Sequence, residues 1–286
     1  MREPKTTLWE SFLKPIVSLL IDEDELRQLY QNIEWEQESA CLSDPSLVYP
    51  LYYSRQDFHG IDGGYLNPEA AVTYDPVTQY VLPPHELWVR QDAIKTVGGE
   101  PRQIIDLGCG TGSSTLMLKQ TFPQAKVTGL DLSPYMLVMA EHKARQARLN
   151  IHWRHGKAEA TGLEAEAFDT VFVSLLFHET PPHISEAIVR ESWRLLVPGG
   201  QMIILDGNQK TLRESDWLTT IFEEPYIKAY AAGSVDDWMR EAGFEAVQTR
   251  EIWWVHQITQ GMKPTGANPQ VQQEYRVASD MLPVPL

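Results

Sequence analysis

The stretch Ile104-Ile105-Asp106-Leu107-Gly108-Cys109-Gly110-Thr111-Gly112-Ser113-Ser114 decides the fold, because an apolar strand runs here into a glycine turn and then into a helix. The glycine spacing is G-x-G-x-G, whereas a dinucleotide fingerprint has G-x-G-x-x-G and places the pyrophosphate at the helix N-terminus. A phosphate-binding loop needs a lysine after its last glycine, and Ser113 and Ser114 follow Gly112 instead. The spacing therefore argues against both of these phosphate sites.

Apolar strands alternate with helix-length segments from residue 102 to residue 206. This pattern is typical of a parallel sheet that helices cover on both faces. Two more β-like runs follow near the C-terminal end. We expect strands over residues 103–107, 126–131, 150–155, 169–175, 201–206, 245–254 and 255–260, and the fold class is α/β.

Local signals place the helices between these strands. Ser133-Pro134 is an N-cap followed by proline at the first helical position, which starts a helix that runs to about Arg148. Pro198-Gly199-Gly200 is expected to stop the helix that begins near His183 and to turn the chain into the next strand. A short helix is expected between Ser234 as its cap and Gly243 as its stop.

The segments on either side of this region differ from it in composition and periodicity. Residues 1–100 are expected to form a cap: a helical stretch over residues 8–38 interrupted at Pro15, then a loop-like region over residues 49–85 rich in aromatics, Gly and Pro. Residues 101–263 are expected to form the nucleotide-binding domain, with an aromatic insertion at about 207–233. Residues 264–286 look like an irregular tail.

The strand and glycine turn resemble motif I of class I S-adenosylmethionine-dependent methyltransferases. In that family the glycine backbone passes close to the methionine part of the cofactor, and an acidic residue that ends the next strand holds both ribose hydroxyls. The matching residue is Asp131, in Val127-Thr128-Gly129-Leu130-Asp131-Leu132-Ser133. A carboxylate that accepts two hydrogen bonds from a diol makes a charge-assisted bidentate contact, which is why the chemistry selects Asp or Glu.

Further matches follow in order along the chain. The run over residues 155–160 resembles the Gly-Asp-Ala-Glu element that contacts adenine, with Lys157 in place of the usual Asp and Ala158 matching. Residues 168–174 resemble motif IV, and residues 195–200 resemble the turn before the family's fifth strand. The resemblance covers about 102–206, is most like the menaquinone and ubiquinone C-methyltransferase group, and implies a Rossmann-like seven-stranded mixed sheet with an antiparallel last strand.

The resemblance assigns a set of residues to the cofactor, S-adenosylmethionine, and no metal is expected. Cys109, one of this set, is most simply read as a small buried residue. The set comprises Asp106, Gly108, Cys109, Gly110, Gly112, Asp131, Leu132, Lys157, Ala158 and Ser174.

The end of the fourth strand faces the methyl group in this fold. Methyl transfer requires alignment and exclusion of water, and a base only for some acceptors. His178 is the first candidate for general base or acceptor positioning, with Glu179 behind it. The alternative is that the two residues only cap the loop or pair with each other. The Asn/Asp/Ser-Pro-Pro-Tyr motif of exocyclic-amine methyltransferases is missing at residues 174–177.

Aromatic side chains gather on both sides of the core region, and they could form a lid over a small apolar or cationic acceptor. The ordinary reading of any single one is that it belongs to the core. The candidates for substrate contact are His59, Tyr65, Tyr74 and Trp88, with Tyr52, Tyr53 and His85 nearby in sequence and Trp217, Phe222, Tyr226 and Tyr230 downstream.

Composition narrows the class of partner. The formal net charge of -15, from 39 Asp+Glu against 24 Lys+Arg, would repel a nucleic-acid backbone and an anionic membrane surface. Two cysteines allow no disulfide framework, and the apolar run over residues 15–21 is too short to span a bilayer. We expect a cytoplasmic protein that acts on a small-molecule methyl acceptor, with neither nucleic acid nor membrane insertion.

Two other functions fit a Rossmann-like sheet. A nucleotide-dependent oxidoreductase is disfavoured by the G-x-G-x-G spacing and by the Pro198-Gly199-Gly200 turn. A non-catalytic module that binds S-adenosylmethionine or S-adenosylhomocysteine stays open, because a fold alone does not establish turnover. The acceptor, the atom that is methylated and the oligomeric state are left open.

Overall fold

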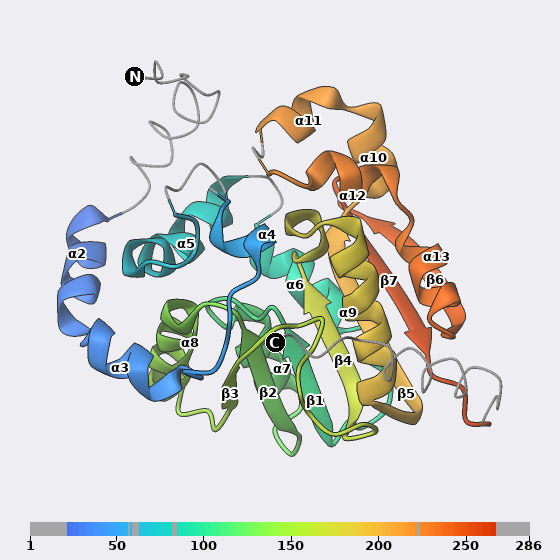
Figure 1. The fold of residues 1–286 in the computed structure, drawn as a ribbon, viewed down its shortest axis with the longest axis horizontal. Helices are drawn as coiled ribbons and strands as arrows, with labels where there is room; N and C mark the ends of the chain where they lie inside the picture. Colours follow the sequence, from blue (N-terminus) through green and yellow to red (C-terminus); the bar gives the residue numbers. More distant parts are fainter. Residues whose placement is uncertain (1–21, 57, 59–62, 82–84, 222–223, 267–286) are drawn as a thin grey trace, which may run out of the picture.

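The strand that precedes the glycine turn is central in the sheet. In the computed structural model, which describes residues 22–56, 58, 63–81, 85–221 and 224–266, β1 (Gln103–Leu107) lies between β2 (Lys126–Asp131) and β4 (Phe168–Ser174). The strand order is β3-β2-β1-β4-β5-β7-β6. The first five strands are parallel, and β7 runs antiparallel to both β5 and β6. The expected seven-stranded mixed sheet with an antiparallel last strand is confirmed (Figure 1).

The remaining strands are β3 (His152–His155), β5 (Leu196–Gly207), β6 (Glu245–Ile252) and β7 (His256–Met262). A 3₁₀-helix, η3 (Phe177–Glu179), follows β4. The helices are α2 (Glu23–Asn32), α3 (Trp35–Leu42), α4 (Leu51–Ser54), α5 (Pro68–Val81), α6 (Glu86–Ile94), α7 (Ser113–Thr121), α8 (Pro134–Ala147), α9 (Pro182–Leu195), α10 (Gln209–Glu214), α11 (Asp216–Ile221), α12 (Ile227–Ala232) and α13 (Val235–Glu241).

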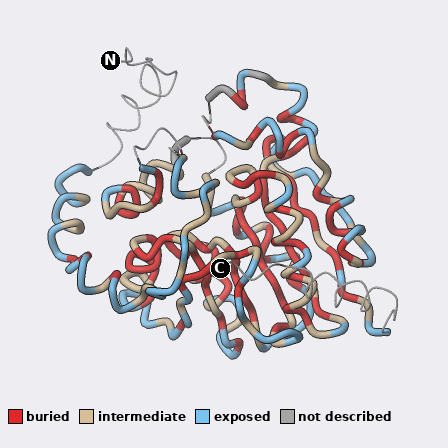
Figure 2. Tube along the Cα trace, in the orientation of Figure 1, coloured by how far each residue is buried: buried red, intermediate tan, exposed pale blue. Residues whose placement is uncertain are grey.

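Side chains of β1 alternate between two hydrophobic clusters, as the two faces of a buried strand require. Ile104 packs with residues of α6 and α7, including Leu118. Ile105 and Leu107 pack in the other cluster, which includes Ile188 of α9. Figure 2 shows the central strands β1, β2 and β4 buried along most of their length, so the helices on both faces leave mainly the ends of these strands exposed to a ligand.

The start of α8 confirms the expected N-cap. The Ser133 hydroxyl accepts a hydrogen bond from the Met136 backbone N–H at 3.2 Å, and Pro134 is the first helical residue. The same hydroxyl donates to the Tyr65 carbonyl at 2.7 Å. One capping residue thus stabilises α8 and also holds the N-terminal region against it.

The prediction of a loop-like region over residues 49–85 is wrong for its described part, because α4 and α5 lie there. Pro76 lies inside α5 and removes one backbone hydrogen bond. Ala70, Ala71 and Val72 of this helix are buried in a cluster with residues of α8. Tertiary burial of this helix therefore offsets the local preference of the sequence for a turn.

The prediction for Pro198-Gly199-Gly200 needs a correction. Helix α9 ends earlier, at Leu195, and the three residues lie inside β5, where the pairing register with β4 shifts. The Gly199 N–H donates to the Lys263 carbonyl at 2.9 Å, and the Lys263 N–H donates to the Gly200 carbonyl at 2.8 Å. The backbone of Lys263, which directly follows β7, thus pairs with this turn and makes it an irregularity within β5.

The expected insertion at 207–233 contains three short helices, α10, α11 and α12. The expected helix with Ser234 as its cap is α13, and the Ser234 hydroxyl accepts from the Asp237 N–H at 3.2 Å. The expected tail lies largely outside the described residues. Within the part of the chain that the structure describes, no helix combines the length and apolar character that crossing a membrane requires.

Gly129 of β2 is a position where only glycine fits. A Cβ at Gly129 would lie 2.4 Å from the Trp153 ring and 3.0 Å from Cys109 Sγ. We expect Gly129→Ala to lower the free energy of unfolding by about 1–3 kcal/mol, because overpacking displaces a ring beside the glycine turn. Chemical denaturation measures this change. Gly98→Ala is the matched control, since its Cβ would make only an ordinary 3.6 Å contact with Gln201; equal stability losses in the two variants would contradict the prediction.

Candidate active site

The glycine turn is fastened to the end of the neighbouring strand by backbone hydrogen bonds. The N–H groups of Gly108 and Cys109 both donate to the Leu130 carbonyl, at 2.8 and 3.0 Å. Gly108 and Gly110 have positive φ angles of 67° and 53°, which an L side chain adopts at a cost. A Cβ at Gly110 would meet nothing within 4 Å, so this part of the turn faces open space.

Asp131, at the end of β2, is tied to the same turn. Its Oδ2 accepts from the Gly110 N–H at 2.8 Å, and its Oδ1 accepts from the Ser133 N–H at 2.8 Å. Burial raises the pKa of the Asp131 carboxyl to about 6, although these two backbone N–H groups act in the opposite direction. Each carboxylate oxygen keeps a lone pair for a further donor, as a diol would need.

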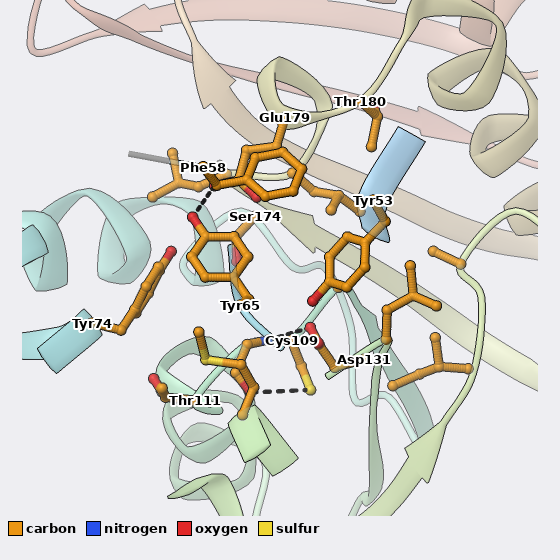
Figure 3. Close-up of a pocket in the computed structure, with 18 of the residues that line it drawn as sticks. Tyr53, Phe58, Tyr65, Tyr74, Cys109, Thr111, Asp131, Ser174, Glu179 and Thr180 are labelled. Atoms are coloured by element: carbon orange, nitrogen blue, oxygen red, sulfur yellow. Dashed lines mark hydrogen bonds between the residues drawn. The ribbon is translucent and has the colours of Figure 1, made fainter. Parts of the chain in front are cut away.

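A pocket opens over the carboxyl ends of the parallel strands, where ligands bind in open α/β sheets. It contains about 780 Å³ of space between atoms, part of it open to solvent. Figure 3 shows Asp131 and Cys109 on one side of it and Glu179 and Thr180 on the other. The pocket brings together these predicted site residues: Tyr65, Tyr74, Gly108, Cys109, Gly110, Asp131, Leu132, Ala158, Ser174 and Glu179.

Two of the predicted cofactor residues lie behind the turn, outside the pocket lining. Asp106 is fully buried, and its Oδ2 accepts from the Thr115 hydroxyl at 2.6 Å. Gly112 is the N-cap of α7, where a Cβ would lie 2.9 Å from both Ala140 and Trp153. The geometry gives both residues a role in holding the turn on its helix.

The structure does not place three further residues that were predicted for the site in the pocket lining. Lys157 is half-buried and does not belong to the lining. Trp88 is 57% exposed, and its ring centroid lies 6.3 Å from that of Trp253 on the surface. His59 lies outside the described residues. Of the downstream aromatics, Trp217, Tyr226 and Tyr230 are also absent from the lining, and Phe222 is outside the described residues.

His178 is turned away from the pocket and pairs with a residue that sequence analysis did not single out. Its Nδ1 lies 2.6 Å from Oδ1 of Asp206, a buried carboxylate near the end of β5. Burial disfavours the imidazolium, but the charge of Asp206 and this hydrogen bond outweigh it and raise the pKa of His178 to about 9. With this pKa His178 is mostly protonated at neutral pH, which argues against the predicted role as general base.

The Asp206 carboxylate also orders the loop after β4. Its Oδ2 accepts from the N–H groups of Leu176 and Phe177, at 3.1 and 2.8 Å. An acidic residue ending the predicted fifth strand was visible in the sequence, but only the parallel pairing of β4 with β5 places it beside the loop. The hydrogen-bond partner of His178 Nδ1 is Asp206, which was not part of the predicted alternative.

Glu179 is the acidic residue of this loop that lines the pocket. Its Oε1 accepts a hydrogen bond from the Tyr65 hydroxyl at 2.7 Å. Tyr65 forms part of an aromatic wall: its ring stacks on Phe58 with centroids 5.2 Å apart and meets the edge of Tyr74 at 5.8 Å. The pocket thus has a carboxylate set in an aromatic surface, opposite the glycine turn (Figure 3).

Arg90 of α6 is a lining residue that sequence analysis missed. Its Nη1 donates to the hydroxyls of Ser114 and Ser174, both at 2.7 Å, and its Nε donates to Glu86 Oε1 at 2.8 Å. Burial opposes the charge of Arg90, but Glu86 outweighs it and raises the pKa. Nothing in the local sequence marks this arginine, because its importance arises from helix α6 packing under β1 and β4.

The N-terminal cap is anchored directly on the glycine turn. The Asp75 carboxylate of α5 accepts from the Thr111 hydroxyl at 2.6 Å and from the Ser113 hydroxyl at 3.2 Å. Lys143 of α8 pairs with the same carboxylate. The cap therefore completes the pocket wall as part of one packed structure. Among the described residues, no group of three or more His, Cys, Asp or Glu side chains is arranged to hold a metal.

The fold and this pocket define a class: a Rossmann-like sheet with a glycine turn after β1 and a carboxylate ending β2, the arrangement of class I methyltransferases. A family model described as a methyltransferase domain matches residues 104–200. A demethylmenaquinone methyltransferase of Lactococcus lactis subsp. lactis is 35% identical over 131 residues, which are 45% of this chain and 51% of the relative. The chain thus spans about half the length of the curated relatives it matches.

Solved structures show the same fold. A SAM-dependent methyltransferase from Aquifex aeolicus superposes with a TM-score of 0.53 at 20% identity, over 68% of this chain and 98% of that one. Human N-acetylserotonin methyltransferase, solved in complex with SAM, gives a TM-score of 0.55 at 14% identity, over 70% of this chain and 58% of that one. Residues 104–200 therefore form a class I, S-adenosylmethionine-dependent methyltransferase domain, and the expected cofactor is confirmed.

The His178–Asp206 pair makes a testable electrostatic prediction. A folded-state pKa of about 9, above the ordinary 6.5, means that the pair stabilises the fold fully below pH 6.5 and loses this contribution as the pH rises through 9. In Asp206→Asn the opposing effect of burial should dominate, and the pKa of His178 should fall by more than one unit. NMR titration of the imidazole nitrogens measures both values. A His178 that titrates near 6.5 in the unaltered protein would contradict the assignment.

Proposed function

We propose that the chain transfers a methyl group from S-adenosylmethionine to a small aromatic acceptor that carries an ionisable hydroxyl. One observation carries this proposal: two carboxylates line the same pocket from opposite sides. Asp131 is placed to bind a nucleoside, and Glu179 is the second carboxylate. Methyl transfer is a direct displacement, so donor and acceptor must share one enclosed space.

The lining residues fit the cofactor. Asp131 has acceptor capacity left for the ribose hydroxyls, and the open space at Gly110 lets a ligand lie against the backbone. Leu132 and Ala158 line the same end of the pocket and would contact the adenine. Arg90 is the buried cation of the lining and would attract the cofactor's α-carboxylate. When bound, S-adenosylmethionine supplies an electrophilic methyl group.

The acceptor end is aromatic. Phe58, Tyr65 and Tyr74 present stacked and edge-on rings to the pocket, which favours a flat, largely apolar acceptor. The substrate named for the Lactococcus relative, demethylmenaquinone, is a quinone, and this supports an aromatic acceptor here. The tyrosines predicted from sequence as substrate contacts, Tyr65 and Tyr74, are retained in this proposal.

Glu179 is the proposed general base. Its carboxylate lines the pocket and is oriented by the Tyr65 hydroxyl, so it can accept the proton of an acceptor hydroxyl. Removal of that proton makes the oxygen, and the ring carbon ortho to it, more nucleophilic. His178 is assigned a positioning role, because its pairing with Asp206 fixes the loop that carries Glu179.

Three expectations from sequence remain proposals. The division into a cap over 1–100, a catalytic domain over 101–263 and a tail over 264–286 is one of them. A cytoplasmic location is another, supported by the free cysteines Cys41 and Cys109. A small-molecule acceptor without nucleic acid is the third, supported by the net charge of -15.

Cofactor binding should depend on the ionisation of Asp131. Because the pKa of Asp131 is about 6 without ligand and a diol needs the carboxylate form, affinity for S-adenosylhomocysteine should be constant above pH 7 and fall as the pH drops below 6. Asp131→Asn should weaken binding by about 10- to 150-fold at pH 7.5. Isothermal titration calorimetry between pH 5 and pH 8 measures both effects. Binding by Asp131→Asn with unaltered affinity would refute the assignment.

The catalytic step is tested with isotopically labelled methyl donor and a panel of hydroquinones and naphthoquinols. Glu179→Gln should lower kcat by about 100-fold or more while affinity for S-adenosylhomocysteine stays within about threefold. Glu186→Gln, on the exposed part of α9, is the matched control and should retain activity. Cofactor binding without methyl transfer to hydroxyaromatics, amines or thiols would favour the non-catalytic binding module instead.

A further inference from the structure

One polar group in the pocket is not accounted for by the proposed reaction. Helix α4 places Tyr53 in the lining, and the Tyr53 hydroxyl oxygen is buried without a hydrogen-bond partner among the described residues. Its ring packs against Phe58, with centroids 5.7 Å apart. Leaving a buried hydroxyl without a partner is unfavourable, so one that lines a pocket points to a partner from a bound ligand.

The Tyr53 hydroxyl faces Asp131. Figure 3 shows the hydroxyl end of the ring directed toward the carboxylate across the pocket. Burial raises the pKa of the Tyr53 phenol well above its ordinary value, and among charged groups Asp131 adds most to this effect. No direct hydrogen bond joins the two groups.

Donor and acceptor counting shows what fits between them. The Asp131 carboxylate, which accepts from Gly110 and Ser133, can accept further hydrogen bonds but donates none. A ribose hydroxyl that donates to this carboxylate still has lone pairs that need a donor. The Tyr53 hydroxyl is a donor directed toward the same carboxylate.

The segment that carries Tyr53, residues 44–54, is held by its neighbours and not by the Tyr53 hydroxyl. The Asp44 N–H donates to His155 Nδ1 at 2.9 Å, and the Tyr49 hydroxyl lies 3.2 Å from His155 Nε2. The Tyr52 hydroxyl donates to Glu159 Oε1 at 3.0 Å. Contacts of the residues that precede Tyr53 thus hold this segment against β3 and the residues that follow it before any ligand binds.

We propose that the Tyr53 hydroxyl donates a hydrogen bond to a ribose hydroxyl of the cofactor, so that Tyr53 and Asp131 hold the sugar from opposite sides. This inference rests on the proposed function, since it requires a nucleoside in the pocket. It makes the N-terminal cap part of the cofactor site as well as of the acceptor site.

The test compares Tyr53→Phe with the unaltered protein in calorimetric titrations at pH 7.5. The ligands are S-adenosylhomocysteine and its 2′-deoxy and 3′-deoxy counterparts. Tyr53→Phe should bind S-adenosylhomocysteine about 3- to 10-fold more weakly, the effect of one hydrogen bond. The deoxy ligand that lacks the contacted hydroxyl should bind to Tyr53→Phe and to the unaltered protein with equal affinity.

Two controls separate ligand contact from structure. Tyr53→Phe without ligand should melt at the same temperature as the unaltered protein or higher, because the variant removes a buried unpartnered hydroxyl. Tyr49→Phe, in the same segment but outside the pocket lining, should change affinity by the same factor for all three ligands.

The possible outcomes separate a failure of this inference from a failure of the proposed function on which it rests. Unaltered affinity of Tyr53→Phe for S-adenosylhomocysteine, together with weakened binding by Asp131→Asn, would overturn the inference alone. An equal loss with all three ligands would also overturn it, because the residue would then act through packing. No binding of S-adenosylhomocysteine by the unaltered protein would overturn the proposed function and this inference together.

Discussion

The structure depends on the attachment of the glycine turn to the end of β2. The N–H groups of Gly108 and Cys109 donate to the Leu130 carbonyl, and the Gly110 N–H donates to the Asp131 carboxylate. These bonds satisfy backbone donors of the turn that would otherwise be unpaired. They also hold a buried carboxylate beside the turn, so that one set of contacts fixes both the bend of the backbone and the charge next to it.

The cap is built on this same turn. Asp75 accepts hydrogen bonds from Thr111 and Ser113, and the Ser133 hydroxyl that caps α8 donates to the Tyr65 carbonyl. The N-terminal helices consequently share their anchor points with the nucleotide-binding loop. This explains why the aromatic wall and the glycine turn line one pocket instead of two separate sites.

Neighbouring residues after β4 have different surroundings. His178 is held by Asp206 as an imidazolium, whereas Glu179 lines the pocket beside Tyr65. A histidine titrates near neutral pH in water, which made His178 the first candidate for a base. The charge of Asp206 and the hydrogen bond with it raise the pKa of His178 to about 9 in spite of burial, which is why the proposed general base is Glu179 and not His178.

The sequence by itself determined the sheet, the glycine turn, Asp131 and the caps of α8 and α13, because periodicity, turn residues and capping act over a few neighbouring positions. Only the tertiary structure decided that Asp206 pairs with His178 and that Arg90 and Tyr53 line the pocket, since each contact joins residues far apart in the chain. Helix α5 forms despite Pro76 for the same reason: burial against α8 outweighs a local preference.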